Sequence, residues 1–329
     1  MTFSTGFVRR PLFLTMIVAL FAIAATACGA SDAGGQDFSL PTPVYPDGLV
    51  SFVVGAEDGT FETDFANAYS AAFAVAASGQ VAVVPQPGSN GVTAVEGFGT
   101  NPKDGQWFLV ISSDQTAAVA TGVTDVDVTR DYQPIQTGTL EPFVFVASSG
   151  SDFSDWGDVV SAASSGSVTV GVKGPETGAA ALNAVGIADA LGLTLDTTPA
   201  GDPAARIATA NGLGLMPLGE AFGLVKSGAG TALLVLGPDE VSSLPGVPIA
   251  ISEGSSFEGL PYLRGFSVSI RTPSFTKDKI GILLRAAKAS AQYQAFITAS
   301  GLEGITIPAG DAGLTFRSQI PEFEALATK

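Results

Sequence analysis

The sequence predicts an α/β fold in which mainly parallel sheets are flanked by helices and divided between two lobes. From Leu49 onward, short apolar runs alternate with glycine-rich loops and helical stretches, an order typical of parallel sheets. The chain has 329 residues, a length typical of about two domains. Hydrophobic residues make up 46% of it, so each lobe can bury a core of its own.

The predicted strands are compact apolar runs bounded by glycine, proline or polar residues. In chain order they are Leu49–Val54, Val81–Val84, Trp107–Ile111, Pro142–Ala147, Val168–Val172, Thr231–Leu236 and Gly265–Ile270. We expect the last of these strands to return to the sheet of the first lobe.

The predicted helices carry apolar residues three or four positions apart, which places those residues on one helix face. These helices are Phe61–Ala77, Val92–Gly99, Thr177–Gly192 and Ile280–Thr298. The last helix has the clearest apolar stripe, with polar and basic residues opposite it. The stripe consists of Ile280, Leu283, Leu284, Ala287 and Ala291.

The order of these elements suggests where the lobes divide. We expect residues 47–141 and 265–329 to form one lobe and residues 142–264 the other, with a cleft between them. The chain would then cross from one lobe to the other twice.

The N-terminal residues have the features of an export signal. A pair of arginines precedes the apolar run Leu12–Ala27, which is short for a transmembrane helix and ends in small residues. Cys28 follows directly, as in a bacterial lipobox, so residues 1–27 are predicted to be removed and Cys28 to be lipidated. Residues 28–46 would be the flexible tether of a protein anchored at the outer face of the cell membrane or in the periplasm. An uncleaved membrane helix is the alternative.

Composition excludes several classes of function. The net charge is −16, from 15 Lys+Arg and 31 Asp+Glu, and such a surface repels nucleic acids and favours a soluble monomer. Without His and with a single Cys, the chain cannot form a Ser-His-Asp triad, an internal disulfide or a cysteine-rich metal site. The chain also lacks the dinucleotide fingerprint and the P-loop, so we expect neither a metal nor a cofactor.

Three glycine-rich loops each follow a predicted strand and precede a predicted helix. They are Gly55–Thr60, Gly88–Gly91 and Gly174–Gly178. Glycine allows backbone N–H groups to approach a ligand closely, and a helix N-terminus directs such donors toward an anion. Because these loops gather at the carboxyl edges of α/β sheets, the sequence predicts a site for a small anionic ligand there.

Four segments occur in an order that resembles a known family. They are Gln80–Gly91 (QVAVVPQPGSNG), Asn101–Val110 (NPKDGQWFLV), Val225–Val235 (VKSGAGTALLV) and Leu244–Gly254 (LPGVPIAISEG). Together they resemble the receptors of tripartite tricarboxylate transporters, the TctC or Bug family, across nearly the whole chain after Cys28. The resemblance implies a two-lobed Venus-flytrap, periplasmic-binding-protein-like fold that closes on di- and tricarboxylates, amino acids or aromatic acids. It also implies that one ligand carboxylate lies against the first strand–helix loop, here Gly55–Thr60.

The sequence departs from the family pattern at three loops. The first loop carries Glu57 and Asp58, which disfavour a nearby anion unless they face solvent or the ligand is cationic or zwitterionic. The family's histidine is missing from the loop Gly174–Ala180, and Thr198–Gly201 lacks the family's Tyr and Lys. These departures affect the identity of the substrate rather than the fold.

The candidate ligand-binding residues lie in these loops, at the end of the third predicted strand and at one arginine. They are Gly55, Ala56, Asp58, Thr60, Ser89, Asn90, Ser112, Ser113, Gly174, Thr177, Gly178 and Arg206. Ordinary structural roles are the alternatives: Ser89 and Asn90 suit a turn, and Thr177 suits a helix N-cap.

The main hypothesis is an extracytoplasmic solute-binding receptor, not an enzyme. It would capture a small organic acid, a di- or tricarboxylate or a related carboxylate, in the cleft between the lobes. It would deliver this ligand to the permease subunits of a tripartite tricarboxylate-type transporter. The alternative is a sensor or receptor for an amino acid or another zwitterion. A hydrolase or lyase with paired carboxylates is a third possibility, but the sequence has no such pair at an informative spacing.

Overall fold

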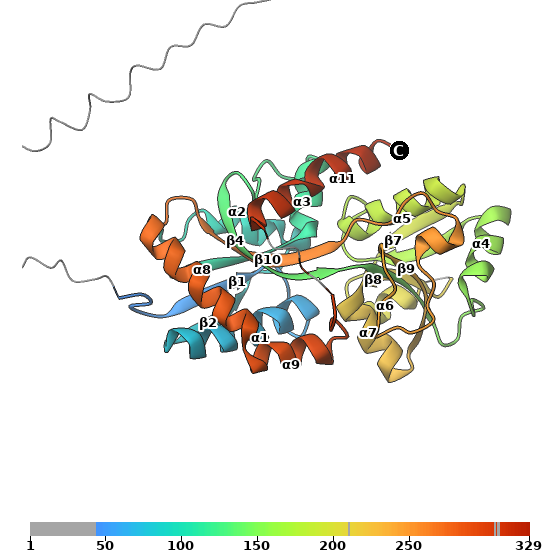
Figure 1. Cartoon of the computed structure of the whole chain (residues 1–329). Coiled ribbons are helices and arrows are strands. Elements are labelled where there is room, and N and C mark those ends of the chain that lie inside the picture. The colour runs from blue at the N-terminus through green and yellow to red at the C-terminus, as the bar shows by residue number, and fades with distance from the viewer. Residues whose placement is uncertain (1–43, 210, 306, 308–309) are drawn as a thin grey trace, which may run out of the picture. The chain divides into compact units, whose positions relative to one another are not determined.

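The computed structural model describes residues 44–209, 211–305, 307 and 310–329 (Figure 1). The predicted signal segment, Cys28 and most of the predicted tether lie outside the described residues. Residues 44–329 form one compact unit. Among the helices of this described part, none is long and apolar enough to cross a membrane.

The first lobe is built on a five-stranded sheet with the order β2-β1-β3-β10-β4. Strand β1 (Val50–Val54) pairs in parallel with β2 (Val81–Pro85) and β3 (Trp107–Ser112). Strand β10 (Tyr262–Ser269) runs antiparallel to β3 and to β4 (Tyr132–Glu141).

The second lobe repeats this plan with the order β7-β6-β8-β5-β9. Strand β6 (Val168–Val172) pairs in parallel with β7 (Leu195–Pro199) and β8 (Leu213–Pro217). Strand β5 (Phe143–Ser148) runs antiparallel to β8 and to β9 (Gly230–Leu236).

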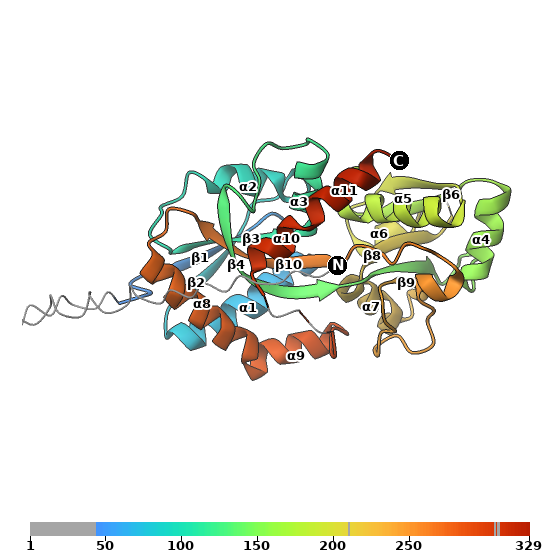
Figure 2. The ribbon, with the colours of Figure 1, turned by 45° about the horizontal axis from the view of Figure 1, so that its top comes forward.

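Both sheets are therefore mixed, whereas the sequence predicted mainly parallel ones. The reason is the crossing of the chain between lobes (Figure 2). Strand β4 leaves the first sheet at Glu141 and β5 begins the second at Phe143, while β10 brings the chain back at Tyr262. Strand β4 runs toward the boundary between the lobes and β10 runs away from it, so the two strands are antiparallel. Strands β9 and β5 are related in the same way in the second sheet.

The same connection fixes the direction of the remaining strands. Since β4 ends at the boundary and β1, β2 and β3 run the same way, the carboxyl ends of all four lie at that boundary. In the second sheet, β6, β7, β8 and β9 oppose β5, which starts at the boundary, so their carboxyl ends lie there too. The ligand-binding edges of both sheets consequently face each other.

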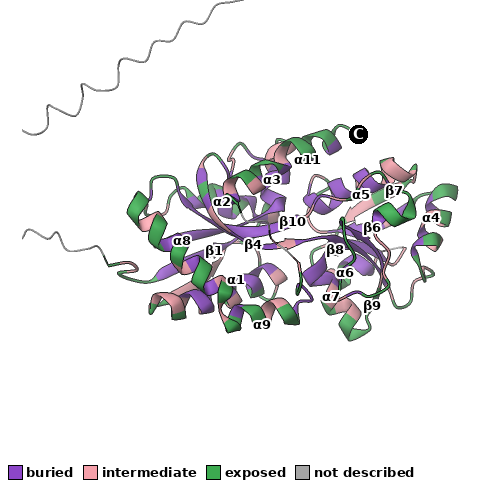
Figure 3. Cartoon of the chain, viewed as in Figure 1, coloured by how far each residue is buried: buried purple, intermediate pink, exposed green. Residues whose placement is uncertain are grey.

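Helices cover both faces of each sheet because successive strand residues point to opposite faces. In the first lobe, Phe52 packs in one core with α1 (Phe61–Ala77) and α8 (Ser274–Ala289), and Val53 packs in another with α2 (Val92–Phe98). The remaining helices of this lobe are α3 (Ser113–Ala120), α9 (Ala291–Ala299), α10 (Ala312–Arg317) and α11 (Gln319–Ala327). Figure 3 shows the two buried sheets and the exposed outer sides of these helices.

In the second lobe, α4 (Trp156–Ser165) and α5 (Ala179–Leu191) cover the side of Phe145, and α7 (Leu218–Ser227) covers the side of Val144. The short helix α6 (Pro203–Ile207) packs on β6 and β8. Two 3-10 turns, Ser89–Gly91 and Ala250–Glu253, complete the described elements.

One prediction about the C-terminal part needs correction. The predicted single helix Ile280–Thr298 is two helices, because Ser290 has extended backbone angles and its Oγ accepts a hydrogen bond from the N–H of Tyr293. Ala291 therefore leaves the predicted stripe and is exposed. The final helix α11 contacts α3 and also α5 of the second lobe.

The close packing of α6 on the second sheet depends on Gly171 in β6. A Cβ at this position would overlap the carbonyl oxygen of Arg206. We expect Gly171→Ala to lower the free energy of unfolding by about 1–3 kcal/mol or more, because the backbone of α6 must shift. Chemical denaturation measures the change. Gly150→Ala is the matched control, since a Cβ there meets nothing within 4 Å; equal stability of both variants would contradict the packing argument.

Candidate functional site

A cavity of about 580 Å³ lies where the carboxyl edges of the two sheets meet, and we call it the interlobe cavity. The first lobe contributes the loop after β1, the start of α1 and the loop after β2. The second lobe contributes the loops after β6 and β7, together with the starts of α6 and α7. A smaller cavity of about 20 Å³, enough for one water-sized group, shares Gly55, Glu62, Asn90 and Lys173 with it.

The structure brings part of the predicted site to these cavities. Six of the predicted residues line the interlobe cavity: Gly55, Ala56, Thr60, Asn90, Gly174 and Arg206. Ser112 lines the smaller cavity. Asp58, Ser89, Thr177 and Gly178 line neither, although they belong to the same loops.

Ser113 lies away from both cavities and is fully buried. Its Oγ donates to Gln319 Oε1 at 2.8 Å and accepts from the N–H of Leu263 at 2.8 Å. It therefore connects α3 to α11 and β10. The alternative N-cap role of Thr177 is wrong, because Gly178 occupies the N-cap position of α5.

The glycine loops contact one another across the boundary. A Cβ on Gly55 would overlap the backbone of Gly91, and a Cβ on Gly174 would lie 2.7 Å from Cγ of Asn90. Asn90 itself has a φ of 55°, in the left-handed region that asparagine tolerates better than most residues. Its side chain thus lies between the first-lobe loop and the Gly174 loop of the second lobe.

At the centre of the boundary lies a buried arginine. Arg264, on β10, is 0% exposed; it forms an ion pair with Glu141 and its Nη2 lies 3.4 Å from both Glu62 and Glu220. Its guanidinium lies 4.6 Å from the ring centroid of Phe61 and 4.5 Å from that of Tyr262. The charge is therefore held by three carboxylates and two aromatic rings.

A lysine joins the two lobes. Lys173 follows β6 in the second lobe; it pairs with Glu62 on α1 and lies 3.6 Å from Oδ2 of Asp114 on α3. Tyr262 donates from its hydroxyl to Asp114 at 2.7 Å. Arg206, which we predicted as a ligand-binding residue, pairs with Glu220 and donates to the carbonyl oxygens of Ala200 and Gly201.

Burial and neighbouring charges shift the pKa of Glu62 in opposite directions, and the same holds for Lys173. Burial alone would raise the pKa of Glu62, but the charges of Lys173 and Arg264 and a hydrogen bond from Lys173 hold it below its usual range. Burial would lower the pKa of Lys173, but Glu62, Asp114 and Glu220 raise it. Both groups are therefore charged at neutral pH.

Sequence analysis missed five charged members of this cluster: Glu62, Asp114, Glu141, Lys173 and Glu220. One signal was present: Lys173 directly precedes the predicted Gly174–Gly178 loop and follows a buried strand. The four carboxylates gave no such signal, because each lies near the end of a different helix or strand and none belongs to a predicted glycine-rich loop.

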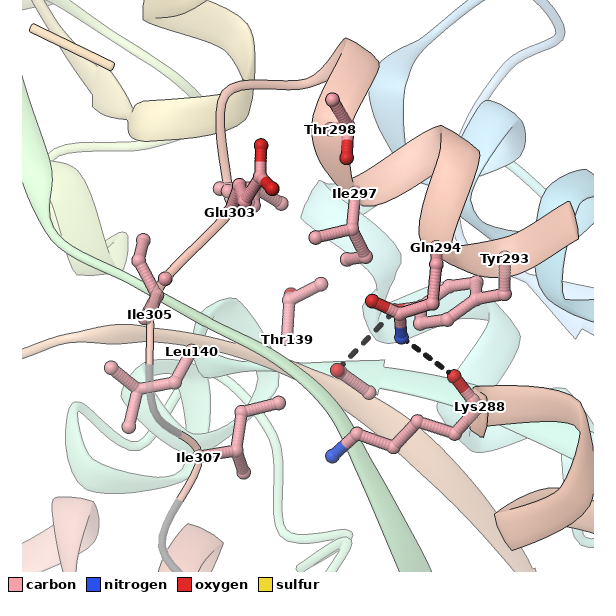
Figure 4. Close-up of a pocket in the computed structure, with 13 residues that line it drawn as sticks. Thr139, Leu140, Lys288, Tyr293, Gln294, Ile297, Thr298, Glu303, Ile305 and Ile307 are labelled. Carbon is pink, nitrogen blue, oxygen red and sulfur yellow. Dashed lines mark hydrogen bonds between the residues drawn. The ribbon is translucent and has the colours of Figure 1, made fainter. Parts of the chain in front are cut away.

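A separate cavity of about 270 Å³ lies in the first lobe, between β4, the helices α8 and α9, and the segment that follows α9 (Figure 4). Gln294 donates to the carbonyl oxygen of Lys288 at 2.8 Å, and Lys288 donates to that of Thr137 at 3.1 Å. Burial lowers the pKa of Lys288. This cavity shares no lining residue with the interlobe cavity.

The structure therefore has two α/β lobes whose carboxyl edges face each other across a cavity. Solved structures with the same fold are TctC and Bug proteins, so the predicted fold is confirmed. MatC of Rhodopseudomonas palustris with bound malate has a TM-score of 0.75 and 16% identity, over 86% of this chain and 100% of that chain.

Two further solved structures agree. A protein of Rhodopseudomonas palustris with adipate has a TM-score of 0.73 and 15% identity, over 85% of this chain and 95% of that chain. A TctC solute-binding protein from Polaromonas without ligand has a TM-score of 0.67 and 16% identity, over 86% and 99% of the two chains. No family model and no curated protein matches the sequence. At such low identities, the likeness establishes the fold.

The lowered pKa of Glu62 predicts a pH-dependent contribution to stability. Because its folded-state pKa lies below the ordinary value of 4.5, its ionised form stabilises the fold above that pH, and the contribution is lost as the pH falls further. We expect Glu62→Gln to be less stable than the wild type by about 3–5 kcal/mol at pH 7, since Lys173 and Arg264 lose a partner.

That difference should shrink as the pH falls below 4.5. Denaturant unfolding of both proteins between pH 7 and pH 3 measures it. A difference that stays constant over this range would show that Glu62 is not held in its ionised form by its neighbours.

Proposed function

We propose that the chain is a diverged TctC or Bug receptor that captures a small organic acid in the interlobe cavity. It would deliver this ligand to the permease subunits of a tripartite tricarboxylate-type transporter. The observation that carries the proposal is a cavity of about 580 Å³ bounded by loops of both lobes. The fold is shared with proteins solved with malate and with adipate.

The proposed location follows from the N-terminal sequence. Residues 1–27 would direct export, and lipidated Cys28 would hold the receptor at the outer face of the cell membrane or in the periplasm. Residues 28–46 would then give the receptor reach toward the permease.

Backbone donors at the start of α1 are the groups best suited to a ligand carboxylate. Thr60 caps this helix of 17 residues and Phe61 begins it, and both line the cavity. N–H groups in the first helical turn have no partner within the helix and carry partial positive charge. The side-chain amide of Asn90 lines the same cavity and can add a further donor.

A zwitterion such as an amino acid is the second candidate, because acidic side chains outnumber basic ones in the cavity lining. The acidic residues are Glu57, Glu62, Asp64, Asp202 and Glu220, and the basic residues are Lys173 and Arg206. An ammonium group on the ligand would offset this surplus of negative charge.

Calorimetric titration against organic acids and amino acids tests the proposal. Because residues 44–329 form a compact unit, a soluble chain from Gly29 onward is suitable. Saturable binding of an acid that is recovered unchanged supports a receptor. Turnover of the ligand, or the absence of binding across the panel, contradicts it.

A charge reversal of the proposed donor gives a sharper test. We expect Asn90→Asp to weaken binding of the acid identified by titration about tenfold or more, because it sets a like charge against the ligand carboxylate. Asparagine and aspartate tolerate the same left-handed backbone, so the fold should be retained. Asn67→Asp, the same change on the exposed side of α1, is the control; equal affinity of the two variants would place the carboxylate elsewhere.

A further inference from the structure

The basic side chains that line the interlobe cavity and the smaller cavity beside it all form ion pairs within the protein. Among the residues the structure describes, they are Lys173, Arg206 and Arg264. Lys173 pairs with Glu62, Arg206 with Glu220, and Arg264 with Glu141. An anionic ligand therefore finds no side-chain cation whose charge is not already neutralised.

Glu62 stands out among the acidic partners because its carboxylate lines both cavities. Its Oε1 accepts from Lys173 of the second lobe, from Arg264 at 3.4 Å and from the Tyr262 hydroxyl at 3.3 Å. A cation from one lobe, a second cation near the crossing strands and a tyrosine hydroxyl are the donors that a ligand carboxylate closed between two lobes would use. In this protein the carboxylate of Glu62, on α1, already makes those contacts.

A second carboxylate cannot share this position. The cluster contains the carboxylates of Glu62, Asp114, Glu141 and Glu220 and the cations of Lys173, Arg206 and Arg264, so it has one more negative than positive group. Another buried carboxylate would add like charge at short range without any cation to offset it.

The chemistry left at this end of the cavity suits a neutral group. The Nε of Arg264 is buried and has no hydrogen-bond partner among the described residues. A neutral oxygen can accept such a hydrogen bond without adding charge to the cluster. The ligand group nearest this cluster is therefore better matched as an amide or a hydroxyl than as an acid.

We infer that Glu62 determines ligand specificity by occupying the position of a second ligand carboxylate, so the cavity selects acids with one carboxylate and rejects dicarboxylates. The inference rests on the proposed function, since it concerns the ligand of the same cavity. Glu62 acts here as a permanent counter-ion of Lys173 and Arg264.

Ligand pairs that differ only in the second carboxylate test the inference on the wild-type protein. Succinate against its monoamide, and glutamate against glutamine, keep chain length and the first carboxylate constant. We expect the amide member of at least one pair to bind at least tenfold more tightly, as measured by calorimetry. Equal or tighter binding of both dicarboxylates overturns the inference, and no variant is needed for this result.

Glu62→Gln tests the assignment to this residue. In the variant, the ratio of the affinities for the amide and the dicarboxylate should fall at least tenfold, because Lys173 loses its closest ion-pair partner and the cluster loses its surplus negative charge. Asp64→Asn is the matched control: it removes a carboxylate of the same helix that also lines the interlobe cavity but forms no ion pair with any residue the structure describes. An equal loss of preference in both variants would assign the effect to overall charge and overturn the role of Glu62.

The outcomes separate the two proposals. If no acid or amino acid of the calorimetric panel, these pairs included, binds the wild type or the Glu62→Gln variant, the receptor function itself fails. If both members bind the wild type equally well, the receptor function stands and the inference fails. Circular dichroism of both variants establishes that they are folded before their affinities are compared.

Discussion

The ion pair between Arg264 and Glu141 is the interaction on which the rest of the site depends, because it lies where the chain crosses between lobes. Both side chains are 0% exposed. Removing two charges from water costs several kcal/mol per ion, a cost that further hydrogen bonds to the pair offset in part. Glu141 has two such hydrogen bonds: Thr139 donates to Oε1 at 2.8 Å, and the backbone N–H of Gly219 donates to Oε2 at 3.0 Å. Since Gly219 lies in the first turn of α7 in the second lobe, one carboxylate fixes the crossing strands and orients the other lobe.

The charges of the cavity follow from this arrangement. Once Arg264 is placed at the boundary, Glu62 and Glu220 approach it from opposite lobes, and each brings a second cation, Lys173 and Arg206 respectively. The protein as a whole carries a net charge of −16, yet its boundary contains a nearly balanced group of buried ions. In the receptor we propose, local pairing would therefore decide which ligand charge is accepted there, while the overall field would act mainly on solubility and on the approach of ligands.

Sequence analysis predicted those elements whose signal is local. The bounds of α1 and β6 match the predicted ones, because Thr60 supplies a cap before a periodic helix and Val168–Val172 is a continuous apolar run. Strand β4 was missed: its sequence YQPIQTGTLE contains proline and polar residues and has no apolar run.

The glycine loops of the site could be predicted because each follows a strand. The ion pairs could not, since Glu62 and Lys173 are 111 positions apart and Glu62 and Arg264 are 202 apart, and only the fold brings them together.

In the receptor we propose, the same distant pairs would couple ligand binding to the separation of the lobes. Lys173 belongs to the second lobe, whereas Glu62 and Asp114 belong to the first, so any movement that opens the cavity must separate these charges. Opening also exposes them to water, and the recovered hydration offsets part of the lost attraction. The closed arrangement is thus stabilised by contacts that need no ligand. A ligand shifts the equilibrium between open and closed forms only by its difference in affinity for the two. Because the protein's own ions already join the lobes, that difference must come from the remaining groups at the boundary, which are the backbone donors of α1 and the side chain of Asn90.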